Sequence, residues 1–180
     1  MRPKSLKSIL GVSLIELLTV MSIISIVTAI ATPSFVGLIQ KFRVMGEANA
    51  LAGALAVARS EAIRQGAKVT LCISTDGVNC DGAETNWLMG WVIFATPVAT
   101  PNTQVPLRVQ NKWKGNDLLK ATQGLFQVDF NRDGFPSNLP ANGTVTFLVD
   151  TNPQNPAARH CVTLSLTGRR DVQAHGQGAC

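Results

Sequence analysis

The sequence predicts an α+β fold in which one long N-terminal helix packs on an antiparallel β-sheet head. Three observations predict it. The 21 residues from 12 to 32 are apolar with one charged side chain, residues 34–65 carry apolar groups at helical spacing, and short strand-like segments separated by turn signals follow Gly66. A long helix followed by a run of strands is typical of the α+β class.

Length and net charge limit the classes of protein to which the chain can belong. A chain of 180 residues suits one domain with an appendage. Its net charge is +5, from 16 basic and 11 acidic residues, but Arg2, Lys4 and Lys7 all precede Gly11. Without these three, 13 basic and 11 acidic residues leave a net charge of +2. With no tyrosine and 6% aromatic residues, the chain is a poor candidate for a wide base-stacking surface.

The apolar run from Val12 to Thr32 is long enough to cross a membrane, since a bilayer core needs about 20 apolar residues in a helix. Basic residues before it keep that end cytoplasmic. An uncleaved anchor and an ordinary secretory signal are the simple alternatives. The secretory signal fits poorly, because its apolar region is about 7–15 residues long and precedes the cut. Here a plausible cut, at Gly11, comes before the run.

Glu16 is the one acidic residue in this run. A carboxylate within a membrane-spanning helix costs a few kcal/mol and marks a functional site by default. Cleavage after Gly11 would create an α-amino group on Val12, four residues away. In an assembly, Glu16 of one subunit could pair with that amine on its neighbour and set the register of the packed helices.

The stretch from Gly11 to Leu17, GVSLIEL, resembles the leader-peptidase site of type IV pilins and type II secretion pseudopilins. The resemblance implies cleavage after Gly11, N-methylation of Val12 and pairing of Glu16 with a neighbour's amine. Pro33, the twenty-second residue after the cut, stands where that family often has a helix-kinking proline. Val12 stands where the family usually has Phe.

A second helical stretch follows Pro33, which would end or bend the helix. Its apolar groups recur at intervals of three and four residues: Leu38, Phe42, Met45, Ala48, Ala52, Leu55, Ala58 and Ala62. Gly66 is a natural stop. The expected organisation is a leader at 1–11, a transmembrane and assembly helix at 12–33, an amphipathic helix at 34–66 and a β-rich head at 67–180.

Strand-like segments follow Gly66 and are separated by Asp-Gly, Asn-Gly and Thr-Gly turns. The predicted strands are Lys68–Ser74, Leu88–Ala95, Leu125–Phe130, Thr144–Val149 and Cys161–Leu166. The Pro- and Thr-rich stretches 96–106 and 151–157 predict loops. Trp87, Trp91 and Trp113 are interpreted as packing residues of the core or loops.

The four cysteines, Cys72, Cys80, Cys161 and Cys180, all follow the apolar run, and this indicates an oxidising compartment and two disulfides. Three connectivities are possible, and proximity in sequence favours Cys72–Cys80 with Cys161–Cys180. Zinc is disfavoured because the spacings do not match a tetrahedral cysteine site.

The middle of the chain narrows the resemblance to the GspH/FimT group of minor pilins and pseudopilins. It is carried by Ala58–Arg64 (ARSEAIR), Val69–Cys72, Asp76-Gly77 with Cys80, Trp87 and Gly90–Phe94, and again by Ser165–Arg169. The cysteine-bearing loops favour a pilus minor pilin over the secretion relative.

The resemblance implies a low-abundance subunit that primes fibre assembly or sits near the fibre tip, in adhesion, twitching motility or DNA uptake. Its partners would be other pilins through the N-terminal helix, a prepilin peptidase and an inner-membrane assembly platform. It would start as a single-pass inner-membrane protein with a periplasmic head and then enter a pilus or pseudopilus.

Two further groups of residues could in principle support chemistry. Asp129, Asn131 and Asp133 match the opening of a calcium loop, but Pro140 stands where an EF-hand needs glutamate, so a strand end with an Asp-Gly turn is the favoured reading. His160 and His175, the only histidines, lie in no catalytic motif. We therefore expect no enzyme and no cofactor.

Two small basic clusters are candidate nucleic-acid contacts. Gly168-Arg169-Arg170 partly matches the GRxR-like C-terminal motif of DNA-binding FimT-like pilins, with Asp171 following. Two or three phosphate contacts would give weak, salt-sensitive binding unless many subunits act together. Lys112 and Lys114 around Trp113 form the second cluster.

Overall fold

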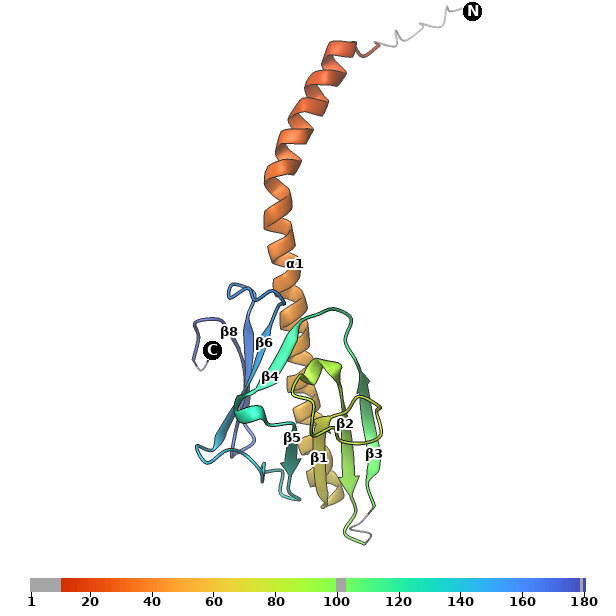
Figure 1. Cartoon of the computed structure of the whole chain (residues 1–180), viewed down its shortest axis with the longest axis vertical. Helices are drawn as coiled ribbons and strands as arrows, with labels where there is room; N and C mark the ends of the chain where they lie inside the picture. The colour runs from red at the N-terminus through yellow and green to blue at the C-terminus, as the bar shows by residue number, and fades with distance from the viewer. Residues whose placement is uncertain (1–10, 100–102, 179) are drawn as a thin grey trace, which may run out of the picture. The chain divides into compact units, whose positions relative to one another are not determined.

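The computed structural model describes residues 11–99, 103–178 and 180. One helix, α1 (Leu14–Gln65), precedes all the strands (Figure 1). The chain forms two compact units, Met1–Leu38 and Ile39–Cys180, so α1 contributes its first part to one unit and its second part to the other. The α1 backbone continues through position 33, while the side chain of Pro33 lies outside the described residues.

The head consists of two four-stranded antiparallel sheets (Figure 1). The first has the order β3-β2-β1-β5, formed by Val105–Asn111, Gly90–Thr96, Lys68–Ile73 and Gln127–Phe130. The second has the order β4-β6-β7-β8, formed by Leu118–Ala121, Thr144–Asp150, His160–Ser165 and Arg170–Ala174. Two short 3-10 turns, η1 (Trp87–Met89) and η2 (Thr122–Gly124), complete the head.

A single large core joins the second part of α1 to both sheets. Trp87 is fully buried and packs edge-on against Phe147 of β6, with ring centroids 5.3 Å apart. Its indole Nε1 donates a hydrogen bond to the carbonyl of Leu125 at 3.0 Å. Burial of this apolar surface is the main driving force for the head, and the packing role predicted for Trp87 is confirmed.

The buried face of α1 differs from the predicted one at its start. Leu38 and Phe42 are 47% and 58% exposed. The buried stripe instead follows alternating steps of four and three residues: Val44, Ala48, Leu51, Leu55, Ala58 and Ala62. The spacing of apolar residues in this helix is compatible with two overlapping apolar stripes. Contact with the sheets determines which of the two is buried.

Three strands were missed, and each is an edge strand or very short. β3 was predicted partly as loop and is exposed along most of its length, with Pro106 near its start. β8 begins with Arg170 and Asp171, and β4 has four residues. Edge strands bury little of either face, so they lack the alternation that identifies a strand. Leu88 and Met89, predicted as strand, belong to η1.

Candidate functional site

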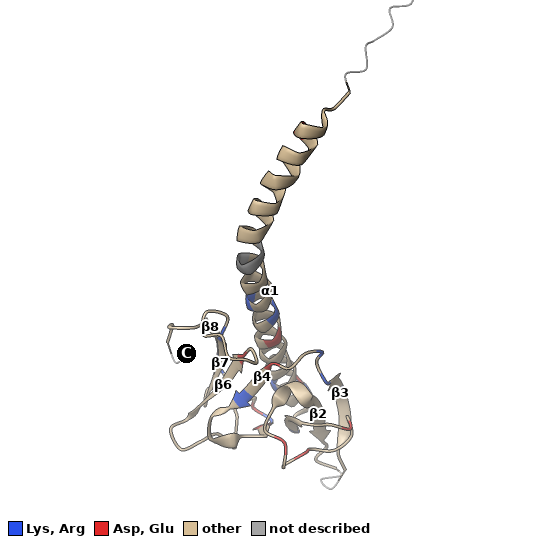
Figure 2. Cartoon of the chain, turned by 45° about the horizontal axis from the view of Figure 1, so that its top comes forward, with Lys and Arg blue, Asp and Glu red and all other residues tan. Residues whose placement is uncertain are grey.

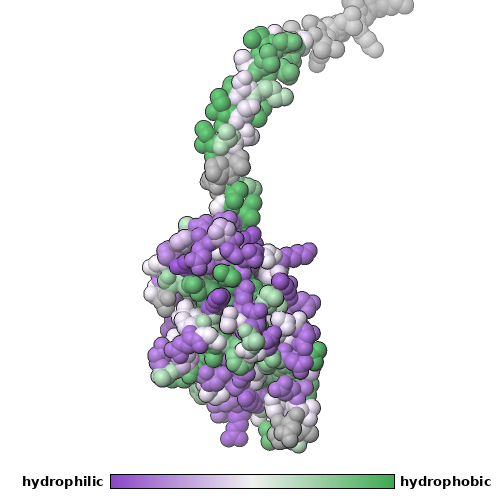
Figure 3. Space-filling model, in the orientation of Figure 1, coloured by the Kyte–Doolittle hydropathy of each residue, from purple (hydrophilic) through white to green (hydrophobic). Residues whose placement is uncertain are grey.

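The first part of α1 exposes large apolar side chains, and Figure 3 shows them on the face in view. Exposed large side chains along it are Leu14, Ile15, Leu17, Leu18, Val20, Met21, Ile23, Ile24, Ile26, Val27 and Ile30. Among the described residues, α1 is the helix that is long and apolar enough to cross a membrane. Charged residues gather instead on its second part and in the head (Figure 2).

The hydroxyl groups in this apolar surface are satisfied by the helix itself. Thr19 Oγ1 donates to Glu16 O at 2.9 Å, and Ser22 Oγ donates to Leu18 O at 2.8 Å. Ser25 donates to Met21 O in the same way at 2.8 Å. A hydroxyl bonded to its own helix carries little cost in an apolar medium. Among the described side chains of the first part of α1, the carboxylate of Glu16 is a polar group without a hydrogen bond to the helix.

Glu16 lies in the first turn of α1, and its side chain is exposed. Its backbone N–H donates to Ser13 O at 3.1 Å. A carboxylate at this end interacts favourably with the helix macrodipole. The described residues form no salt bridge with Glu16. Gly11 and Val12 precede the helix and are exposed, whereas the basic leader residues before Gly11 lie outside the described part of the chain.

Two disulfides brace the head, Cys72–Cys80 and Cys161–Cys180, with Cα–Cα distances of 5.5 and 5.4 Å. They are the pairs that sequence proximity favours. The first ties β1 to the loop that follows it, and the second ties β7 to the C-terminal residue. Each therefore fixes a segment that has little regular secondary structure of its own.

Asp76 organises the loop closed by Cys72 and Cys80. Its Oδ1 accepts hydrogen bonds from the backbone N–H groups of Val78 and Asn79, both at 2.8 Å. Ser74 Oγ donates to the same oxygen at 3.0 Å. These donors, the Asn79 backbone first, hold the pKa of the Asp76 carboxyl well below its usual range. The loop is thus a fixed surface feature.

The turn that carries the predicted GRR motif is anchored to α1 by Arg59. Arg59 Nη1 donates to the carbonyl of Gly168 at 2.7 Å. Gly168 has φ +72°, and a Cβ there would lie 2.8 Å from Arg59 Nη1. Only glycine suits this left-handed conformation at so close a contact. A Cβ at Gly134 would lie 3.2 Å from Arg59 Cγ, so Arg59 lies close to a second glycine turn as well.

Arg169 and Arg170 lie at the surface beside this turn. The side chain of Arg169 is 77% exposed, and its Nε lies 3.1 Å from Asp171 Oδ2. Arg170 opens β8 opposite Leu164 and is exposed. The structure therefore brings two cations together on one turn, with the charge of one partly balanced by Asp171.

Two of the three calcium candidates, Asp129 and Asn131, use their side chains for internal contacts. The carboxylate of Asp129 is buried, accepts a hydrogen bond from Thr70 Oγ1 at 2.7 Å and lies 2.9 Å from Lys68 Nζ. Asn131 Oδ1 accepts from the backbone N–H groups of Asp133 and Phe135 at 3.0 and 2.9 Å. Within the described ranges, no group of three or more His, Cys, Asp and Glu side chains could hold a metal ion.

His160 and Cys161 do not form a nucleophile and base. His160 is buried in β7, and its Nδ1 lies 2.9 Å from the carbonyl of Ala158. Cys161 is committed to its disulfide and has no thiolate to offer.

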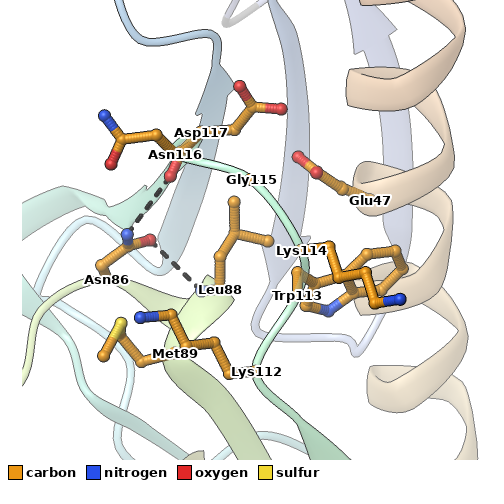
Figure 4. A pocket seen from close by; sticks show the side chains of 10 residues that line it. All are labelled: Glu47, Asn86, Leu88, Met89, Lys112, Trp113, Lys114, Gly115, Asn116 and Asp117. Atoms are coloured by element: carbon orange, nitrogen blue, oxygen red, sulfur yellow. Dashed lines mark hydrogen bonds between the residues drawn. The ribbon is translucent and has the colours of Figure 1, made fainter.

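Sequence reasoning missed a buried ionic cluster between α1 and the loop 112–117. Arg43 forms two hydrogen bonds with Asp117. Glu47, one helical turn further on, is 1% exposed. Figure 4 shows Glu47 and Asp117 beside the loop. Burial, together with the charge of Asp117, raises the pKa of Glu47 to about 7, although Arg43 opposes this. The available signal was that Glu47 lies beside Val44, Ala48 and Leu51 on the helical wheel.

An exposed apolar helix leading into a disulfide-braced β head defines a type IV pilin-like subunit. The model of the family described as Type II transport protein GspH matches residues 47–168. The chain belongs to this family, whose members are structural subunits of pili and pseudopili and not enzymes. The resemblance to minor pilins of the GspH/FimT group is thereby confirmed.

Solved structures with the same fold come from both kinds of fibre. The type IV minor pilin FimU of Pseudomonas aeruginosa is 18% identical, with a TM-score of 0.58 over 75% of this chain and 91% of FimU. The minor pseudopilin EpsH from the type 2 secretion system of Vibrio cholerae is 15% identical, with a TM-score of 0.53 over 74% of this chain and 98% of EpsH. No curated protein matches the chain.

Proposed function

We propose that the chain is a minor pilin of a type IV pilus, a low-abundance subunit that primes or joins fibre assembly. The observation that carries the proposal is the first part of α1, which is apolar all around and has one carboxylate, Glu16, in its first turn. Such a surface needs either lipid or other apolar helices around it. Both environments occur when a subunit passes from a membrane into a fibre.

Processing supplies the partner for Glu16. Cleavage after Gly11 by a prepilin peptidase removes the basic leader and leaves a methylated amine on Val12. In the fibre, Glu16 pairs with the amine of a neighbouring subunit, and Pro33 adapts the helix to the packing. Before assembly the subunit is a single-pass inner-membrane protein with its head, residues 67–180, in the periplasm. An assembly platform in that membrane then draws it into the fibre.

The two disulfides support a periplasmic head, because disulfides persist in oxidising compartments. A pseudopilin of the H type is the related alternative, since the family description names type II transport. The test is to shear fibres from cells that carry the chain's own assembly system. We expect the subunit in the pilus fraction, with a mass that starts at methylated Val12. Recovery only with secretion pseudopili would favour the H-type pseudopilin.

A second candidate function is DNA capture for natural transformation. The observation that favours it is the exposed pair Arg169 and Arg170 on a turn anchored by Arg59. Gel shifts at several salt concentrations would compare the chain with its Arg169→Ala/Arg170→Ala variant and with a Lys112→Ala/Lys114→Ala variant, which removes the second basic cluster. Equal retention of DNA by the wild type and the arginine variant would remove this function.

A further inference from the structure

A cavity of about 50 Å³ lies between α1 and the loop 112–117, which links β3 to β4 (Figure 4). Glu47 projects into it from α1, and Trp113 borders it from the loop. Two buried polar atoms here have no hydrogen-bond partner in the part of the chain that the structure describes: Glu47 Oε2 and Trp113 Nε1. One is an acceptor when ionised, and the other is always a donor.

The neighbouring polar groups are already committed elsewhere. Asp117 accepts two hydrogen bonds from Arg43, the longer at 2.8 Å. Asn86 Oδ1 accepts from Leu88 N at 3.2 Å and from Leu119 N at 2.9 Å. Its amide nitrogen donates to the carbonyl of Asp117 at 3.3 Å. Asp117 also lies close enough to Glu47 to raise its pKa through a side-chain hydrogen bond, in which protonated Glu47 is the donor. Glu47 Oε2 and Trp113 Nε1 remain without a partner among the described residues.

The hydrogen-bonding chemistry of Glu47 Oε2 and Trp113 Nε1 indicates what can occupy the cavity. A cation would suit Glu47 but would meet the N–H of the indole, and an anion would be repelled by Glu47. A water molecule accepts from the indole and donates to the carboxylate. Roughly 10–15 Å³ of such volume is enough for one water, so the cavity has room for one to a few. Leaving both atoms unsatisfied would cost the desolvation penalty of each.

We propose that the cavity is an internal water site, in which a bound water bridges Trp113 Nε1 and Glu47 Oε2 and so joins α1 to the loop 112–117. Asp117 on the loop and Arg43 on the helix are the charged groups that act on Glu47, and Lys112 and Lys114 line the same cavity. Burial raises the pKa of Glu47 to about 7. Below this pH the water would accept a hydrogen bond from protonated Glu47, and above it the water would donate one to the carboxylate.

The test is water–indole cross-relaxation by NMR on the full chain in detergent micelles, with ¹⁵N-labelled tryptophan. We expect the Trp113 indole proton, assigned with Trp113→Phe, to show a cross-peak to a long-lived water. Trp87 is the internal control, because its indole donates to Leu125 O and should show none. The Trp113 signal should also titrate between pH 5 and pH 8.

Two variants separate the outcomes. Glu47→Gln keeps the size and a polar tip, so the water cross-peak should remain while the titration disappears. Glu47→Met removes the acceptor, so the cross-peak should be lost. A wild-type Trp113 signal without a water cross-peak would overturn the proposal, even if it titrates, because the indole would then bond to the carboxylate directly. A cross-peak that persists in Glu47→Met would also overturn it.

Discussion

Arg43 and Asp117, 74 residues apart in sequence, form a two-point ion pair that joins α1 to the residue before β4. The Asp117 side chain is 3% exposed, whereas the Arg43 side chain is 43% exposed. The carboxylate is therefore desolvated, and the guanidinium of Arg43 is the cation that neutralises it. The same loop carries Trp113 onto the core, so the pair holds a segment without regular secondary structure against the helix.

Replacing Arg43 with methionine should lower the free energy of unfolding by about 1–3 kcal/mol, the cost of leaving a buried acceptor without its partner. Because Arg43 is partly exposed, the loss in free energy of unfolding should be smaller than the loss for a fully buried ion pair. Urea unfolding of the full chain in detergent measures it. Lys41→Met is the matched control, since exposed Lys41 forms no ion pair in the described structure and should change stability by less than about 0.5 kcal/mol. Equal effects of the two substitutions would contradict this role.

Glu47 should make the head less stable as pH rises towards neutrality. Its pKa is about 7 in the folded chain against an ordinary 4.5, so between these values the folded state holds a proton that the unfolded state has released. Stability therefore falls from pH 4.5 to pH 7 and levels off above, by roughly 3 kcal/mol at 1.4 kcal/mol per pH unit. Glu47→Gln should not share this loss. Parallel stability–pH curves for wild type and variant would show that the pKa of Glu47 is not raised.

The two disulfides should differ modestly in their contribution to stability. Loop closure depends on the logarithm of loop length, so the separations of 8 and 19 residues correspond to about 2.5 and about 3 kcal/mol. Serine pairs at Cys72/Cys80 and at Cys161/Cys180, unfolded under identical conditions, measure each contribution. A loss below 0.5 kcal/mol for either pair would mean that other contacts already hold that segment.

Gly168→Ala should cost more than Gly124→Ala, although both glycines have positive φ. The backbone cost of about 1–2 kcal/mol is common to both. A Cβ at Gly168 would also displace Arg59 from its hydrogen bond, which adds about 1 kcal/mol, whereas nothing lies within 4 Å of the corresponding position at Gly124. Thermal unfolding of the two variants gives the comparison, and equal shifts would show that Arg59 relaxes freely.

The elements that the sequence predicted well were those with strong local signals. The uninterrupted apolar run, the helical spacing from Ala48 to Ala62 and the buried central strands β1, β2, β6 and β7 all carry their pattern in consecutive residues. β3 and β8 were not predicted, because an edge strand forms by pairing with its neighbour's backbone and needs no alternation of apolar and polar residues in its own sequence.

The buried cluster at Glu47 illustrates the second limit of sequence reasoning. Arg43 and Glu47 look like an ordinary surface pair one helical turn apart. The burial of Glu47 and the ion pair of Arg43 depend on a loop that begins 65 residues after Glu47, and nothing in the local sequence indicates that this loop returns to α1. The role of Arg59 beside Gly168 was hidden for the same reason.

Incorporation of a Glu16 variant into fibres tests the central claim most directly. Glu16→Ala and the neighbouring polar control Ser22→Ala would be expressed in cells that carry the chain's own assembly system, and the subunit would be quantified in the membrane and in sheared fibres. Both variants should insert in the membrane, with Ser22→Ala reaching fibres at the wild-type level and Glu16→Ala at least tenfold less. If Glu16→Ala enters fibres as well as Ser22→Ala does, the carboxylate is not the assembly contact.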